Sequence, residues 1–177
     1  DESDDTFEAE IKDDCLSIVY RLLFVFYAES RADLDILPIS DSIYQKGYSL
    51  EMLRDLEQTK LVTDHSLNGY FFHDSLKQLF QLMSSGYRET ENGSNKSFRI
   101  RHIDSPMFDD TKLHHLSNVK FRNYVWQDVI CQLSLSRQQN KKARGRISYA
   151  NLGINQLGSV YESLLAYRGF YAEEDYI

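Results

Sequence analysis

The stretch TFEAEIKDDCLSIVYRLLFVFYAE, residues 6–29, decides the fold of this chain. Its apolar side chains recur at spacings of three and four, which gathers them on one broad face of an α-helix. Acidic residues crowd its start, where negative charge meets the positive end of the helix dipole, and Asp5 or Thr6 can serve as N-cap. We therefore expect a long amphipathic helix. Its core face consists of Phe7, Ile11, Cys15, Ile18, Val19, Leu22, Leu23 and Phe26.

The composition of the chain favours helices around a hydrophobic core. The 177 residues are 42% hydrophobic, which suffices for one domain, or for one domain with a small appendage. Only 2 prolines and 8 glycines are present, and so few breakers favour long helices over a β-sandwich with many turns. The most apolar run, residues 22–28, is too short to span a bilayer. We expect a cytoplasmic protein with no membrane partner.

Four more helices are predicted after the first one. One spans residues 49–60 with Ser49 as N-cap, and another spans residues 73–85 with Gly86 at its C-cap. A third begins after Ser117 and ends near residue 134, and the last runs from about residue 154 to about residue 167. Within the last helix Gly158 removes a side chain among apolar neighbours, so we expect a close helix–helix approach there.

The signals for β structure are few and local. Asn68-Gly69 accepts the positive φ angles of a tight turn, which predicts a short hairpin within residues 61–72. Residues 98–103 alternate weakly and predict a short strand or an extended segment that Pro106 ends. Pro38 opposes any helix before Asp41. The predicted fold class is mainly α: a multi-helix domain with at most a small β hairpin or short strands.

Charge is distributed unevenly along the chain. The net charge is −7, the wrong sign for a domain that holds nucleic acid by bulk attraction. Acidic residues are dense over residues 1–14, whereas residues 137–146 carry base with no acid between. This basic segment is the candidate DNA contact, because lysine and arginine release counterions from phosphates, and its alternative interpretation is a solvated linker between two helices. Its cationic residues are Arg137, Lys141, Lys142, Arg144 and Arg146.

Motifs for cofactor chemistry are missing from the sequence. No two glycines are spaced as G-x-G and no Gly-Lys-Ser/Thr occurs, so neither the dinucleotide fingerprint nor a P-loop is present. The two prolines, Pro38 and Pro106, also exclude the Pro-Pro-aromatic loop that amino-group methylation of a base commonly uses. We therefore assign no catalytic, cofactor-binding or metal-binding residue to this chain.

Two tripeptides match the acid-x-lysine core of a Mg²⁺-dependent nuclease, which needs acids and a lysine around the metal. They are Glu10-Ile11-Lys12 and Asp110-Thr111-Lys112. The first lies on a predicted helix, where positions two apart diverge, and the second has no apolar strand to carry it. We interpret both as solvated charged faces.

The histidines and cysteines show no spacing typical of a metal site. We expect surface or capping roles for the histidines. Cys15 and Cys131 each lie in an apolar helical pattern, which predicts reduced, buried thiols. The histidines are His65, His73, His102, His114 and His115.

Several blocks of the sequence resemble, in order, one region of large bacterial type IIG restriction-modification enzymes and related phage-defence adenine methyltransferases. YRLLFVFYAESR at residues 20–31, followed by Leu37-Pro38, resembles the family's RLLFLLYAEDRGLLP. Tyr48-Ser49-Leu50 is similar to the phrase that follows it, and SPMFD at residues 105–109 resembles an LFD segment. ISYANLG with QLGSVYESLL, within residues 147–165, is similar to IDYRDLGVRELGSVYEGLL.

The resemblance implies a parent enzyme that transfers a methyl group from S-adenosylmethionine to N6 of adenine in DNA, sometimes fused to a nuclease that uses Mg²⁺. The resembling region is the helical segment before the methyltransferase domain. Its implied partners are that domain and, through the parent, DNA. The family's cofactor and catalytic motifs have no matching positions here. We expect a helical connector or scaffold domain over residues 1–136, a flexible basic loop over 137–146, and over 147–177 a helix packed on the same core that leads into an absent methyltransferase domain.

Three hypotheses for the function follow. The leading one is a non-catalytic connector that places the catalytic modules around DNA, with part of the last helix, together with Phe170 and Tyr171, exposed for lack of the rest of the enzyme. The alternative is a DNA-binding module that acts through the basic segment. The third is a standalone nuclease that depends on Asp110.

Overall fold

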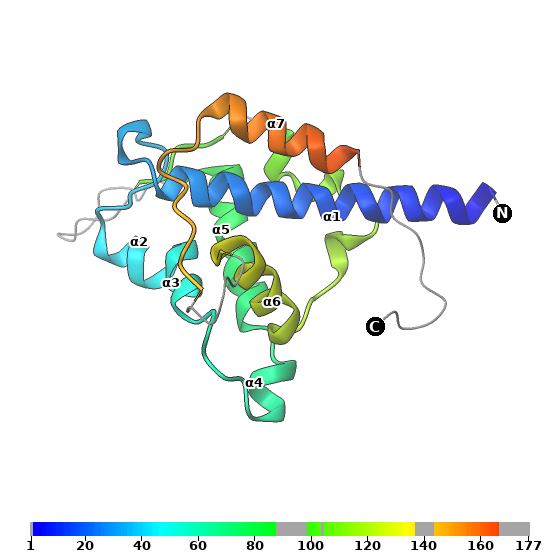
Figure 1. The fold of residues 1–177 in the computed structure, drawn as a ribbon, viewed down its shortest axis with the longest axis horizontal. Coiled ribbons are helices and arrows are strands. Elements are labelled where there is room, and N and C mark those ends of the chain that lie inside the picture. Colours follow the sequence, from blue (N-terminus) through cyan, green and yellow to red (C-terminus); the bar gives the residue numbers. More distant parts are fainter. Residues whose placement is uncertain (1, 88–98, 104, 137–143, 167–177) are drawn as a thin grey trace.

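The computed structural model describes residues 2–87, 99–103, 105–136 and 144–166, with side chains from Thr6 onward. These residues form seven α-helices and four short 3₁₀ helices (Figure 1). The β pairing within the described ranges consists of two isolated bridges, Tyr87 with Ile100 and Leu135 with Arg146. The predicted fold class, a multi-helix domain with hardly any β structure, is confirmed.

Helix α1, Glu2–Glu29, runs along the whole molecule, and its N-terminal turns extend beyond the other helices (Figure 1). The predicted helix is confirmed, but the predicted N-cap at Asp5 or Thr6 is wrong because the helix begins upstream of both. The predicted core face is buried only in the second half, where Leu22 and Phe26 are covered. Phe7 remains 42% exposed because the N-terminal turns lie outside the body of the fold.

The segment after α1 follows its capping signals. Helix α2, Ser42–Gly47, begins after Asp41, whose carboxylate accepts the N–H groups of Ile43 and Tyr44, in agreement with the expected break at Pro38. Helix α3, Leu50–Asp55, has the predicted N-cap Ser49, which accepts from the N–H of Met52, but it is shorter than predicted. The chain leaves the helix after Asp55 and carries Glu57 into the core, where it is 3% exposed.

Helix α5, Phe71–Ser85, confirms the predicted helix and its terminating glycine. Gly86 has φ 72°, and a Cβ there would lie 2.8 Å from the backbone nitrogen of His102. Only glycine combines this left-handed conformation with so close a neighbour. Ile100, two residues before His102, forms an isolated antiparallel bridge with Tyr87. This bridge is the β structure of the described residues 99–103, which belong to the predicted strand or extended segment over residues 98–103.

The predicted hairpin within residues 61–72 is wrong. The chain forms helix α4, Asp64–Asn68, with a capping box between Thr63 and Ser66. This reciprocal pair of hydrogen bonds stabilises a helical turn and overrides the turn preference of Asn68-Gly69. Gly69 has φ −68°, and what requires glycine there is space: a Cβ would lie 2.7 Å from the carbonyl oxygen of His65.

Helix α6, Asn123–Ser134, starts later than predicted. Residues Leu116–Asn118 form a separate 3₁₀ helix, and the chain then runs extended to α6. The start of α6 is fixed by Asn123, whose N–H donates to Gly69 O at 2.8 Å. The Asn123 side chain accepts from Phe72 N–H and donates to Ser66 O, which joins α6 to α4 and α5.

Helix α7, Ile154–Leu165, lies antiparallel beside α1 (Figure 1). The contact is made by Leu157, which is 1% exposed, and by Tyr161, whose ring centroid lies 4.5 Å from that of Tyr20. The expected close approach at Gly158 is wrong, because a Cβ there would meet nothing within 4 Å. Gly158 therefore faces open space, and the contact with α1 is made by Leu157 and Tyr161.

Arg21 anchors the non-helical part of the fold to α1. Its side chain is 2% exposed. The guanidinium donates to Met107 O at 2.6 Å, to Asp109 O at 3.2 Å and to the Asp110 carboxylate at 2.6 Å. These acceptors lie in the 3₁₀ helices Pro106–Phe108 and Asp110–Lys112 and in the residue between them. None of the described helices is long and apolar enough to cross a membrane.

We predict that Arg21→Met destabilises the protein by about 3 kcal/mol, because two partly buried backbone carbonyls and a carboxylate lose the buried guanidinium that donates to them. Arg101→Met is the matched control, since Arg101 also lies 2.6 Å from a carboxylate, that of Asp35, but with a side chain that is 59% exposed. An exposed pair contributes below about 0.5 kcal/mol. Urea unfolding measures both variants, and an equal loss in the two would contradict the anchoring role of Arg21.

Candidate functional site

The described part of the basic segment is held by the protein itself. The Arg146 guanidinium lies against α3 and its C-terminal end, 3.0 Å from a Glu51 oxygen, 2.9 Å from Asp55 and 3.2 Å from Glu57. The hydrogen bond that Arg146 donates to Asp55, together with the charges of Glu51 and Glu57, raises the pKa of Arg146. The charge of Arg146 is therefore neutralised within the fold.

Arg144 also binds its own chain. Its side chain donates to Ser136 O at 2.8 Å and to Leu135 O at 3.2 Å. Arg137, Lys141 and Lys142 lie outside the described residues. A DNA contact of the basic segment thus stays a prediction, and the two described members already have partners inside the protein.

Arg54 lies beneath Arg146 and is 7% exposed. It donates to Ser134 O at 3.1 Å and to Ile147 O at 2.7 Å, which joins α3 to the end of α6 and to the chain that leads toward α7. Its guanidinium lies 5.5 Å from the Phe26 ring, and Phe26 stacks on Tyr149 with 5.0 Å between centroids. This buried arginine satisfies the backbone carbonyls of two separate segments and packs on an aromatic ring, which is a structural role.

Glu57 is the least satisfied polar group of this region. One of its oxygens accepts from Arg146 Nε, while the other, Oε2, is buried without a hydrogen-bond partner. Its backbone carbonyl accepts from the Cys131 thiol at 2.9 Å. A buried carboxylate with one free oxygen depends strongly on the single cation that it does contact.

We predict that Arg146→Ala destabilises the protein by about 2 kcal/mol, because Glu57 loses its cation while buried. Adding Glu57→Gln to Arg146→Ala should recover part of the loss, since a neutral amide costs less to bury than an unpaired carboxylate. Urea unfolding of the two single variants and the double variant gives the coupling. Strictly additive losses would show that Glu57 does not depend on Arg146.

Glu29 is a second polar centre, at the C-terminal end of α1. It accepts hydrogen bonds from Tyr44 Oη at 2.6 Å, from Leu50 N at 2.7 Å and from Glu51 N at 2.9 Å. Burial raises the pKa of Glu29 to about 7, against these three hydrogen bonds, which favour the ionised form. The sequence does not predict these hydrogen bonds of Glu29, because its partners lie in α2 and α3, which are distant from Glu29 along the chain.

We predict that the carboxyl group of Glu29 titrates near pH 7. The unfolded chain releases this proton near its ordinary pKa of 4.5 and the folded chain only near 7. The folded state therefore binds more protons in this window, and the Glu29 contribution to the free energy of unfolding falls as pH rises from 4.5 to 7. Carbon-13 NMR of the side chain measures the midpoint directly, with Glu29→Gln assigning the signal. A midpoint near 4.5 would contradict the effect of burial.

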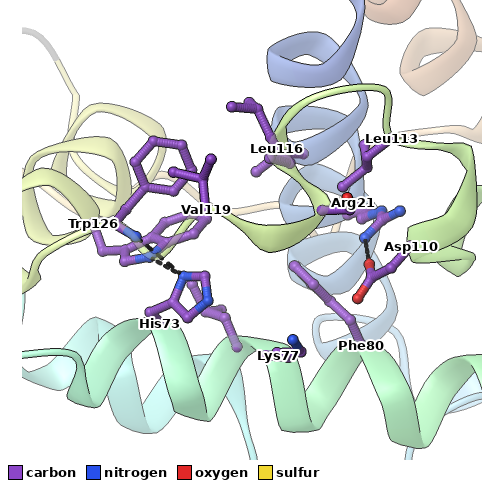
Figure 2. A pocket seen from close by; sticks show the side chains of 13 residues that line it. Arg21, His73, Lys77, Phe80, Asp110, Leu113, Leu116, Val119 and Trp126 are labelled. Carbon is purple, nitrogen blue, oxygen red and sulfur yellow. Dashed lines mark hydrogen bonds and ion pairs between the residues drawn. The ribbon is translucent and has the colours of Figure 1, made fainter. Parts of the chain in front are cut away.

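A small pocket lies between α1, α5, α6 and the chain that joins α5 to α6 (Figure 2). Its volume is about 40 Å³. His73 lines the pocket from α5, and its Nδ1 accepts from Trp126 Nε1 at 3.3 Å and from Phe121 N at 3.4 Å. Burial lowers the pKa of His73, and the positive charges of Lys120 and Lys77 nearby lower it further. The pocket is lined by Ile18, Arg21, His73, Leu76, Lys77, Phe80, Asp110, Leu113, Leu116, Ser117, Val119, Phe121 and Trp126.

The acids of the two nuclease-like tripeptides have structural partners. Asp110 pairs with Arg21 at 2.6 Å, and Glu10 lies 2.7 Å from Nε2 of His115. Between these contacts, Asp14 accepts three backbone N–H groups, those of His114, His115 and Leu116. Burial of Asp14 raises its pKa, but the three N–H groups outweigh burial, so the net shift is downward. No group of three or more potential metal ligands occurs among the residues that the structure describes.

The prediction for the cysteines is wrong in one part. Both thiols are free of disulfides, but Cys15 is exposed and Cys131 is half-buried. Cys15 lines a hollow together with Leu116, Val125 and Val129, and its side chain there is open to solvent.

No protein-family model, curated protein or solved structure matches the chain. The arrangement of its residues therefore carries the functional argument together with the resemblance of its sequence blocks. Within the described ranges, the charged clusters hold backbone groups and each other, and the His73 pocket is one of the hollows that polar side chains line.

Proposed function

We propose that this chain is a non-catalytic helical connector domain of a DNA restriction-modification enzyme or adenine-N6 DNA methyltransferase, which places the catalytic modules around DNA. The proposal rests on the resemblance of the sequence blocks to that family. The structure adds one supporting observation: the blocks contact one another in three dimensions, as parts of one packed domain do.

Each later block contacts the block on α1. Leu50 of the second block donates its N–H to Glu29 at 2.7 Å. Met107 of the third block accepts from Arg21 at 2.6 Å. Tyr149 of the last block stacks on Phe26 with 5.0 Å between ring centroids. The blocks thus make up one packed unit with α1 at its centre, which supports the interpretation of the resemblance as that of a whole domain.

The surface of α7 suits a connector. Its side toward α1 is buried at Leu157, while Ile154 is 61% exposed, Val160 39% and Leu165 44%. At 100° per residue these side chains do not form one contiguous patch, so the assignment of α7 to a partner module rests on the resemblance of its sequence to the family. We assign this surface to the parent's methyltransferase domain. S-adenosylmethionine, and Mg²⁺ where the parent is also a nuclease, would be held by modules other than this one.

The proposal is tested in the full enzyme that carries this domain. Tyr161→Ala removes the ring that packs on Tyr20 and loosens α7 on α1. We expect kcat/KM for adenine methylation to fall about tenfold, because small misplacements of catalytic modules are costly, with the Kd for S-adenosylmethionine unchanged. Transfer of labelled methyl groups to DNA and calorimetry measure the two quantities.

Tyr124→Ala is the matched control, since this tyrosine is 51% exposed on α6, away from α7. Its kcat/KM should equal that of the wild type. Methyl transfer by residues 1–177 alone would refute a non-catalytic role, and a full enzyme that neither binds S-adenosylmethionine nor methylates DNA would refute the proposed parentage.

DNA binding through the basic segment is the alternative. Of its five cations, Arg144 and Arg146 are bound within the fold, so the alternative depends on Arg137, Lys141 and Lys142. No contact in the described residues favours it over the connector role.

A further inference from the structure

We propose that the His73 pocket binds a small carboxylate, of the size of formate or acetate, between Lys77 and His73. This inference is independent of the connector role. Figure 2 shows the two side chains on neighbouring turns of α5, with His73 next to Trp126 and Lys77 toward Phe80. Four observations carry it: an uncompensated cation, a free donor, the size of the pocket and its apolar walls.

Lys77 supplies the uncompensated cation. Its side chain lines the pocket and is half-buried, and no carboxylate of the described residues lies within 4 Å of it. The other charges nearby are paired: Arg21 with Asp110 at 2.6 Å, and Lys120 with Asp74 at 3.0 Å. The pocket therefore carries one net positive charge, and a partly buried ammonium group favours an anionic partner.

His73 supplies the free donor. Because Nδ1 accepts from Trp126 and Phe121, the neutral ring carries its proton on Nε2. No hydrogen bond within the described residues uses Nε2. The lowered pKa keeps the ring in this neutral form near pH 7. An acceptor in the pocket would thus meet an N–H group from His73 and an ammonium group from Lys77.

The size and walls of the pocket select the ligand. A volume of about 40 Å³ holds roughly three water-sized groups, since one water needs about 10–15 Å³ on this measure. A planar carboxylate has two oxygens for the two donors, and the methyl group of acetate or the C–H of formate can contact the apolar walls at Leu113, Leu116 and Trp126. A phosphate ion is larger and has four oxygens to satisfy, so it fits this pocket less well.

Trp126 makes the proposal testable by fluorescence, because it is the chain's 1 tryptophan and lies in the pocket wall. Sodium acetate is titrated against sodium chloride at constant ionic strength and pH 7. We expect a saturable change in Trp126 emission with a Kd of about 1–10 mM, the weak range expected for so small a ligand. Sodium phosphate should produce no saturable change.

Lys77→Met should weaken acetate binding at least about tenfold, since the ion pair is lost. Lys46→Met, at an exposed lysine of α2 outside the pocket, is the matched control and should bind as the wild type does. Lys77→Arg keeps the charge and replaces Lys77→Met if that variant does not fold; its larger head should also reduce binding in so small a pocket.

Nitrogen-15 NMR of the His73 ring gives a second measurement. Bound acetate should raise the pKa of His73, because a negative charge stabilises the imidazolium form, and the rise should be absent in Lys77→Met. A wild type without saturable response up to 100 times the expected Kd would overturn the proposal and leave the pocket to water. An equal response in wild type and Lys77→Met would overturn it as well.

Discussion

Buried charges on α1 hold the backbone of the rest of the chain. Arg21 donates to the carbonyls of Met107 and Asp109. Asp14 accepts the N–H groups of His114, His115 and Leu116. The described residues between α5 and α6 form three short 3₁₀ helices and one isolated bridge, which leave backbone groups without partners in regular structure, so side chains replace the missing partners where these residues are buried. One helix therefore supplies both an apolar face and the polar contacts that keep an irregular segment in the core.

Glu29, another charged residue of α1, holds backbone groups of α3 in the same way. Its carboxylate accepts the N–H groups of Leu50 and Glu51 at the start of that helix, where the backbone has no partners of its own. Burial disfavours the ionised form of this carboxyl group and raises its pKa to about 7. Apolar contacts tolerate small shifts between helices, whereas these charged contacts fix which residues meet. A domain that must hold other modules in place benefits from such a unique arrangement.

The sequence predicts the features that depend on neighbouring residues. The long first helix follows from periodicity, the cap at Ser49 from side-chain chemistry, and the glycine after α5 from its backbone freedom, whereas helix α2 and its N-cap Asp41 are not among the predicted elements. The partners of the buried charges are not predictable in this way, because Arg21 and Met107 are separated by 86 positions and Asp14 and His114 by 100. The hairpin at Asn68-Gly69 fails for a local reason, since two signals compete and the capping box of Thr63 and Ser66 prevails.

The basic segment shows why a charge run in a sequence does not by itself indicate a surface. Arg146 lies far along the chain from the acids of α3, and in sequence it belongs to a positive cluster. In the fold it lies within 3.2 Å of three carboxylates, one of them buried. A cation in this position contributes to the fold, and DNA could recruit it only by leaving Glu57 without its partner. The cost of that exchange favours a structural role for Arg146. Any contact of the segment with DNA would therefore depend on its three remaining cations rather than on all five.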